Sequence, residues 1–176
     1  MFSDSLIQAL GRIARDVING QLRRSTTPRR GSSTRKPPLS GRYPGDFRGK
    51  PTLNYDPHPG KLPDPGEIAW AWVPFEEDHS QGKDRPVLII GRDGDWLIAL
   101  PLTSKDHDRD ARQEAAEGRY WVDVGTGSWD PQRRASEVRV DRVIRVNPLE
   151  VRRVGGQLGK AEFDRVAAGL RRHWAD

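Results

Sequence analysis

The chain has 176 residues, of which 34% are apolar and 31% charged, and its formal net charge is +5. This length is enough for one ordinary domain with additional segments and too short for two full domains. The absence of cysteine and the scattered positions of the four His residues argue against disulfide scaffolds, thiol nucleophiles and zinc sites. No run approaches the roughly 20 apolar residues that span a bilayer, and the N-terminus lacks a secretory pattern. We therefore expect a cytoplasmic protein without a membrane span.

The positive charge is concentrated in the N-terminal part. Residues 1–65 contain 12 Lys/Arg and 5 Asp/Glu, whereas residues 66–176 contain 18 and 20. A basic segment attracts nucleic-acid phosphates whatever their sequence. A solvated tail that charge keeps soluble explains the same composition, so this feature alone does not decide between the two interpretations.

Three segments precede the main domain. Apolar residues at helical spacing predict an amphipathic helix over residues 1–22. Residues 23–51 are rich in Pro, Gly, Ser and Arg and predict a disordered linker, whereas residues 52–65 are expected to lie over the domain as extended chain. We thus divide the chain into this helix, a basic linker and arm over residues 23–64, and a domain over residues 65–176.

From Gly66 onward, short apolar or alternating runs bounded by turn residues predict a β-rich domain. The predicted strands are 68–73, 86–91, 96–102, 119–124 and 136–146. The turn Asp93-Gly94-Asp95 joins the second and third strands in a hairpin. An apolar stripe predicts a final helix over residues 160–174. The expected fold class is mainly β (α+β), a curled antiparallel sheet with the C-terminal helix packed on it.

Arg85 is the first residue that we single out for chemistry. It lies where the polar loop 79–84 meets the strand that begins at Pro86, and the proline stiffens the chain so that the guanidinium is aimed consistently. A fixed fork of five donors suits a phosphodiester on which negative charge is building. The alternative is an arginine at a strand edge, paired without function with Asp84, Glu76 or Glu77.

Thr103 and Ser104 follow the third strand, where hydroxyl groups commonly only cap a turn. In a hairpin, however, the start of one strand lies beside the end of the next. Both side chains can therefore point into one pocket together with Arg85.

Several fragments in this order resemble the PemK/MazF family of toxin endoribonucleases. The family shows a Gly-Asp/Glu-Ile strand, a loop ending in Arg-Pro, an aliphatic strand, and a strand ending in Pro-Leu/Ile-Thr-Ser. The matching fragments are Gly66-Glu67-Ile68, Lys83 to Ile89, Pro101 to Ser104, Ser136 to Val143, and Gly156-Gln157-Leu158. The resemblance covers about residues 65–172 and leaves the N-terminal extension outside it.

The resemblance implies an SH3-like, partly open barrel that forms a homodimer and acts as the toxin of a type II toxin–antitoxin system. Its partners would be single-stranded RNA and a cognate antitoxin, and the toxin–antitoxin complex would also bind DNA. Cleavage would be sequence-specific and would need no metal or other cofactor. The ribose 2′-hydroxyl would attack the adjacent phosphorus, leaving a cyclic phosphate and a free 5′-hydroxyl.

In this scheme Arg85 would stabilise the charge on the phosphoryl oxygens and Thr103 would position the phosphate. The general base is open. His79, in the loop before Arg85, is one candidate because an imidazole titrates near neutral pH, and an exposed loop histidine without a role is the other interpretation.

A localised groove of cations can hold RNA phosphates whatever the net charge of the domain. The predicted RNA-binding residues are Lys83, Ser104, Arg139, Arg142 and Arg145. The chain departs from the family in one strand: many relatives carry Gln after the Asp and Arg two residues further on, where this chain has Arg142 and Ile144. It also has an acidic insert, residues 105–117, beside the expected cleft.

Two other hypotheses remain open. The same barrel could be a non-catalytic binder, like the related gyrase-poisoning toxins or a degenerate RNA-binding regulator. The gyrase-poisoning toxins depend on a C-terminal helix with acidic ends, which the basic end Arg171-Arg172-His173 disfavours. The N-terminal helix could be a built-in inhibitor or dimer clasp, with packing unrelated to activity as the alternative.

Overall fold

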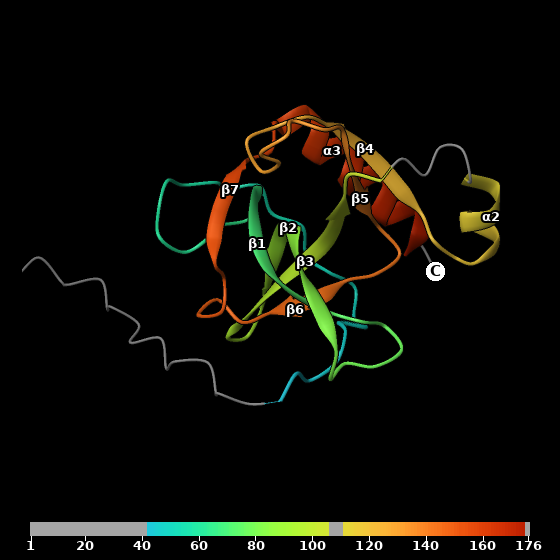
Figure 1. Ribbon diagram of the computed structural model, residues 1–176, viewed down its shortest axis with the longest axis horizontal. Coiled ribbons are helices and arrows are strands. Elements are labelled where there is room, and N and C mark those ends of the chain that lie inside the picture. Colours follow the sequence, from blue (N-terminus) through green and yellow to red (C-terminus); the bar gives the residue numbers. More distant parts are fainter. Residues whose placement is uncertain (1–41, 106–110, 175–176) are drawn as a thin grey trace, which may run out of the picture. The chain divides into compact units, whose positions relative to one another are not determined.

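The computed structural model describes residues 42–105 and 111–174 (Figure 1). The predicted helix 1–22 and the linker as far as residue 41 lie outside the described residues. The chain divides into two units, residues 1–35 and 36–176, and every described residue belongs to the second. None of the helices in this described part is long and apolar enough to cross a membrane.

The described part of the chain forms one antiparallel sheet with a long helix at its C-terminal end. The strands are β1 (Glu67–Pro74), β2 (Gly82–Asp93), β3 (Trp96–Thr103), β4 (Trp121–Gly125), β5 (Ser136–Arg139), β6 (Ile144–Val146) and β7 (Arg153–Gln157), and the helices are α2 (Ala111–Ala116) and α3 (Lys160–His173). The strand order is β4-β5-β3-β2-β1-β7, with β6 also paired to β3. Figure 1 shows the sheet curling into a partly open barrel, with α3 beside β4 and β5. The predicted fold class is therefore confirmed.

The predicted hairpin of the second and third strands is present. β2 pairs with β3 from Val87 opposite Pro101 to Asp93 opposite Trp96, and the turn contains Gly94 at a positive φ of 59°. β2 begins at Gly82, earlier than expected, because its first residues continue the ladder with β1. A Cβ at Gly82 would lie 2.4 Å from the carbonyl oxygen of Val73, so glycine permits this close approach. Arg85 consequently lies inside a strand.

The single strand expected over residues 136–146 is divided into β5 and β6. Both segments pair with β3, β5 through Leu102 opposite Val138 and β6 through Ala99 opposite Ile144. The residues between them bulge out of the ladder, and such a bulge bends a strand and redirects its side chains. The sequence contains a signal for it, because the apolar alternation shifts phase after Val140.

Strand β7 was not predicted from the sequence. Its residues, RVGGQ, include two glycines and have no alternating apolar pattern, so neither strand propensity nor periodicity indicated it. It pairs with β1 at the edge of the sheet, and Gly156 lies there at a positive φ of 152°.

Buried apolar side chains form two clusters. One contains Leu88, Leu100 and the inward face of α3, including Phe163 and Leu170, and the other contains residues such as Ile89. Because neighbouring residues of a strand point to opposite faces, the clusters occupy the two faces of the curled sheet. This two-sided burial makes the sheet a rigid support for side chains at its open end.

Residues 42–64 form an arm that lies along the barrel. Phe47 N–H donates to the Val143 carbonyl (2.8 Å) and Asn54 N–H to the Ile90 carbonyl (3.0 Å), while Phe47, Leu53 and Tyr55 pack against the first apolar cluster. The sequence interpretation ended the linker at residue 51. In the structure, residues 42–51 already belong to the arm, because their aromatic and backbone groups find partners on the barrel.

Candidate functional site

The site lies where the sheet divides. Val87 and Pro101 are the last residues that pair β2 with β3. Beyond them Leu102 and Thr103 turn away to pair with β5, while the start of β2 continues along β1. A cleft therefore opens between the beginning of β2 and the end of β3.

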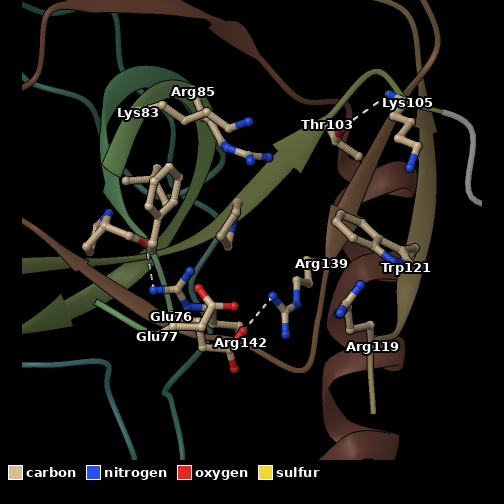
Figure 2. Close-up of a pocket in the computed structure, with 14 residues that line it drawn as sticks. Glu76, Glu77, Lys83, Arg85, Thr103, Lys105, Arg119, Trp121, Arg139 and Arg142 are labelled. Atoms are coloured by element: carbon tan, nitrogen blue, oxygen red, sulfur yellow. Dashed lines mark hydrogen bonds and ion pairs between the residues drawn. The ribbon is translucent and has the colours of Figure 1, made fainter. Parts of the chain in front are cut away.

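This cleft has a volume of about 490 Å³. Because side chains alternate along a strand, residues of one face line the cleft. Arg85 pairs with Ala71 in the β1–β2 ladder, and Thr103 pairs with Glu137 in the β3–β5 ladder. Figure 2 shows Arg85 and Lys83 on one side of the cleft, Thr103 and Lys105 on the other, and Arg139 below them, joined to Glu76. The expected convergence of Arg85 and Thr103 on one cavity is present.

The cleft carries an excess of positive charge. Its ionisable lining residues are Lys83, Arg85, Lys105, Arg119, Arg139, Arg142, Glu76 and Glu77. Six cations and two carboxylates thus line the cleft, while Asp46, Asp141 and Glu117 each pair with one of the cations from outside the lining. Low-dielectric walls focus the positive field that remains. An anion that enters the cleft is therefore attracted.

Arg85 is a half-buried cation without a counterion among the described residues. Its guanidinium makes no hydrogen bond within this part of the chain either. Burial lowers the pKa of its guanidinium, and the nearby charges of Arg142 and Arg139 lower the pKa further. The interpretation of Arg85 as half of a surface ion pair thus finds no partner in the described part of the chain.

Thr103 keeps its hydroxyl proton available. Its Oγ1 accepts a hydrogen bond from the Lys105 backbone N–H (3.1 Å), which is the ordinary role of a hydroxyl at a turn. This bond uses an oxygen lone pair and leaves the O–H free to donate. Thr103 can therefore donate to an oxygen of a ligand while it fixes the turn.

Carboxylates hold both Arg139 and Arg142 in the lining of the cleft. Arg139 donates to Asp141 (2.6 and 2.9 Å) and to Glu76 (3.0 Å). Burial alone would lower the pKa of Arg139, but hydrogen bonds to Asp141 and Glu76 together with the charges of these carboxylates raise it. Arg142 is only 8% exposed and donates to Asp46 and to the Pro74 carbonyl. Both guanidinium groups are thus fixed rather than mobile.

A second hollow of about 230 Å³ lies behind the fork in the sheet. Lys83, Arg85 and Thr103 line both cavities, whereas the even-numbered Asp84 and Ser104 line only the second. Because even-numbered residues of these strands point to the other face, the fork exposes Arg85 and Thr103 from both sides of the sheet.

Two predicted site residues lie elsewhere. His79 and Arg145 line a pair of other cavities beside the arm and do not line the cleft. The His79 ring packs edge-on against Tyr43, with centroids 5.0 Å apart. Arg145 donates to Asp93 and to the backbone carbonyls of Gly45 and Asp46. The functional roles expected for His79 and Arg145 stay predictions.

The sequence analysis did not identify several residues that line the cleft. Glu76 and Glu77 follow β1, Lys105 follows the Thr-Ser pair, and Arg119 and Trp121 come from the start of β4. Lys105 could have been found from its position next to Ser104. Arg119 and Trp121 required knowledge that β4 pairs with β5, since Trp121 stands opposite Arg139.

No cluster of three or more His, Cys, Asp or Glu side chains suited to a metal occurs within residues 42–105 and 111–174. The charged groups of the cleft are instead mostly Lys and Arg, which bind anions directly. The fold and the site thus define a small antiparallel β-barrel with a cleft lined mostly by Lys and Arg side chains at a fork in its sheet.

Residues 64–174 match the family described as the PemK-like, MazF-like toxin of type II toxin–antitoxin systems. The chain belongs to this family, as the motifs from Gly66 to Leu158 led us to expect. The match begins at the end of the arm, so residues 42–63 precede the family region.

The chain is also similar to several solved structures, at low sequence identity. MazF from Deinococcus radiodurans is 17% identical, with a TM-score of 0.48, over 66% of this chain and 100% of that chain. An endoribonuclease from a mycobacterial species is 17% identical, with a TM-score of 0.42, over 65% and 92% of the two chains. A MazE–MazF complex from Deinococcus radiodurans is 16% identical, with a TM-score of 0.46, over 66% and 98%. Among curated proteins, none matches the chain significantly.

Proposed function

We propose that the protein is a sequence-specific endoribonuclease that cleaves single-stranded RNA in the cleft at the fork between β2 and β3, and that it acts as the toxin of a type II toxin–antitoxin system. The observation that carries this proposal is Arg85, a half-buried cation without a partner among the described residues, which lines the same cleft as the Thr103 hydroxyl. Membership of the toxin family gives the biological setting.

The proposed reaction is an internal transfer within the RNA. The 2′-oxygen attacks the adjacent phosphorus as its proton leaves, the bond from phosphorus to the 5′-oxygen breaks, and the 5′-oxygen gains a proton. The products are a 2′,3′-cyclic phosphate and a 5′-hydroxyl. Because negative charge grows on the non-bridging oxygens, the fixed donors of Arg85 stabilise the transition state more than the ground state. Thr103 donates to one of these oxygens and fixes the phosphate in line.

We assign the proton acceptor to Glu77 in preference to His79. Glu77 lines the cleft and makes no ion pair with a described residue, whereas Glu76 is engaged by Arg139. His79 does not line the cleft. A carboxylate within reach of the 2′-hydroxyl, directly or through one water, is able to accept its proton.

The remaining cations of the cleft bind the flanking phosphates in this proposal. Lys83 on β2 and Arg139 on β5 line the cleft together with Arg85, and Ser104 adds a hydroxyl group at the second hollow. The exposed Tyr120, 44% accessible, is an available surface for base stacking. A cognate antitoxin with an acidic segment would compete for the same cations, and two copies of the chain would assemble as a homodimer.

The test is to incubate the purified protein with a long RNA in EDTA and to map the cleaved ends. We expect cleavage at a recurrent sequence, with 5′-hydroxyl ends. Thr103→Val, which removes the hydroxyl group at similar volume, should slow cleavage about tenfold or more, and Thr103→Ser should retain most of the activity. Binding of RNA without cleavage would instead favour a non-catalytic binder. Dependence on added metal would contradict the metal-independent mechanism.

A further inference from the structure

The arm provides a carboxylate that holds one arginine of the cleft. Arg142 Nε donates to Asp46 Oδ2 (2.7 Å), and Arg142 Nη2 donates to Asp46 Oδ1 (3.2 Å). The Tyr43 hydroxyl in turn donates to Asp46 Oδ1 (2.6 Å). We call Tyr43, Asp46 and Arg142 the arm clamp. Its two arm residues precede the region, 64–174, that matches the toxin family, and 96 positions separate Asp46 from Arg142.

The clamp leaves one edge of Arg142 available. Arg142 Nη2 also donates to the Pro74 carbonyl (2.9 Å). Arg142 Nη1 makes no hydrogen bond within residues 42–105 and 111–174. Arg142 also lines the cleft together with Arg85 and Arg139. A guanidinium fixed on one edge and free on the other is a directed donor for a phosphate oxygen.

The position of Arg142 is electrostatically unfavourable in the protein alone, because other cations line the same cleft. The charge of Arg142 contributes to the lowered pKa of Arg85, so the two cations repel each other. A carboxylate outside the cleft therefore has to retain Arg142 at this place. An RNA phosphate that enters relieves the repulsion, and the favourable interaction is then made only with ligand bound.

We propose that Asp46, oriented by Tyr43, is a positioning residue that holds Arg142 in the lining of the cleft so that its free edge binds a phosphate of the RNA. This inference rests on the proposed endoribonuclease function. The arm thereby supplies the counterion that the buried Arg142 requires.

Arg145 provides a matched comparison. The arm also holds this residue, through the carbonyls of Gly45 (2.9 Å) and Asp46 (3.0 Å), and Asp93 accepts from its Nε (2.8 Å). Arg145 does not line the cleft, however. Asp93→Asn therefore removes a carboxylate from an arm-bound arginine that does not line the cleft.

The experiment is a double-mutant cycle between Asp46→Asn and Arg142→Gln, measured as KM and kcat on a short RNA that contains one mapped cleavage site. Asp46→Asn alone should raise KM about tenfold and change kcat about twofold or less, because a phosphate contact outside the reacting bond is lost. In the Arg142→Gln background the same change should have no further effect on KM. Tyr43→Phe should give a smaller increase, and Asp93→Asn should leave KM unchanged.

A second measurement follows the clamp without RNA. The Nε–H of Arg142 should give a slowly exchanging signal in ¹H–¹⁵N spectra of the wild-type protein and lose its protection in Asp46→Asn. An equal rise in KM for Asp93→Asn, or an undiminished effect of Asp46→Asn without Arg142, would overturn the positioning role alone. A wild-type protein that neither binds nor cleaves RNA would overturn the proposed function as well, while the spectra would still show whether the clamp exists.

Discussion

The environment of the Arg85 side chain gives the most direct support for the proposed chemistry. Its guanidinium is half-buried, unpaired among the described residues and close to other cations. Such a group is unfavourable in a protein that needs only stability, since an uncompensated buried charge costs free energy. The most economical explanation is that the missing anion arrives with the substrate.

Substitution of Arg85 should therefore lower kcat more than it raises KM. For Arg85→Ala we expect a decrease in kcat of about 10²- to 10³-fold, because the donor aimed at the developing charge is lost. Arg85→Lys keeps the charge but not the two-pronged geometry and should fall between the wild-type protein and Arg85→Ala. Single-turnover cleavage of an RNA with one mapped site measures the effect.

Lys83→Ala is the control for this experiment, because Lys83 lines the same cleft from the same strand. It should raise KM and flatten the dependence of binding on salt while kcat changes little. An equal loss of kcat in both variants would mean that the cleft needs positive charge in general and not the Arg85 donors.

The sequence predicted Arg85 and Thr103 because the information that unites them is local. A tight turn at Gly94 closes the hairpin, a register shift between Ile89 and Gly91 moves the pairing by one residue, and strand alternation then decides which side chains share a face. The sequence predicted Arg142 as a site residue but not the contacts that hold it, since its partner Asp46 lies 96 positions away in a segment without periodicity. His79 was expected near Arg85 because it precedes it in sequence, but the loop carries it to the arm.

The arm is a structural element although it contains no regular secondary structure. Its backbone finds partners on β2 and on the bulge before β6, and its aromatic side chains complete the first apolar cluster. The composition that predicted a linker was a poor guide here. A few aromatic residues spaced along a Pro- and Gly-rich chain can pack on a preformed barrel, where the barrel supplies the order that the segment cannot generate alone.

Asp46 should make the stability of the protein depend on pH in the acid range. Burial alone would raise the pKa of this carboxyl group, but hydrogen bonds from Arg142 and Tyr43 and the charge of Arg142 hold its pKa below the usual 3.8. A carboxyl whose pKa is lower in the folded state contributes stability above its unfolded pKa, and the contribution disappears as pH falls through the folded value. The clamp should thus be fully effective at neutral pH and weaken below about pH 4.

Urea unfolding of the wild-type protein and Asp46→Asn between about pH 2.5 and pH 7 tests this dependence, over a range chosen to span the usual carboxyl pKa values. The difference in unfolding free energy should be greatest at neutral pH and shrink in acid. A difference that stays constant across the range would show that the Asp46 charge does not act on stability.

Tyr55 tests how firmly the arm is attached. Its hydroxyl donates to the Leu158 carbonyl (2.8 Å) and accepts from Gln157 Nε2 (3.0 Å), and its ring packs against Phe163 of α3. Tyr55→Phe keeps the ring and removes both hydrogen bonds, so the unfolding free energy should fall by about 1–2 kcal/mol. Tyr120→Phe, at an exposed ring just before β4, should change it by less than about 0.5 kcal/mol.

The interruption between β5 and β6 shows what periodicity can and cannot establish for an element. The shift of phase after Val140 was visible in the sequence, and it marks the bulge that carries Arg142. The consequence of the bulge depended on β3, because that strand pairs with both segments and thereby sets the direction of the chain between them. Pairing of distant strands is a tertiary property, which a single-sequence pattern does not contain.

The second unit of the chain, residues 36–176, should fold without the unit before it. The chain divides between residues 35 and 36, and the described contacts that attach the arm begin at Tyr43. A boundary at this place separates the stability of the barrel from any regulatory role of residues 1–35. That separation is useful because three roles are open for the basic N-terminal segment and its predicted helix: inhibition of the enzyme, attraction of RNA, or no role in activity.

A pair of deletions makes the separation measurable. Removal of residues 1–35 should leave the unfolding free energy within about 0.5 kcal/mol of the full-length value, because it ends at the boundary between the units and removes none of the contacts made by Tyr43, Asp46 and Phe47. Removal of residues 1–50 should cost about 3 kcal/mol or more, since Arg142 would stay buried without its carboxylate. Urea unfolding gives both values, and RNA cleavage by the shorter deletion then reports on residues 1–35 alone. An increase in cleavage at unchanged stability would identify a built-in inhibitor, whereas equal destabilisation by both deletions would contradict the boundary at the arm.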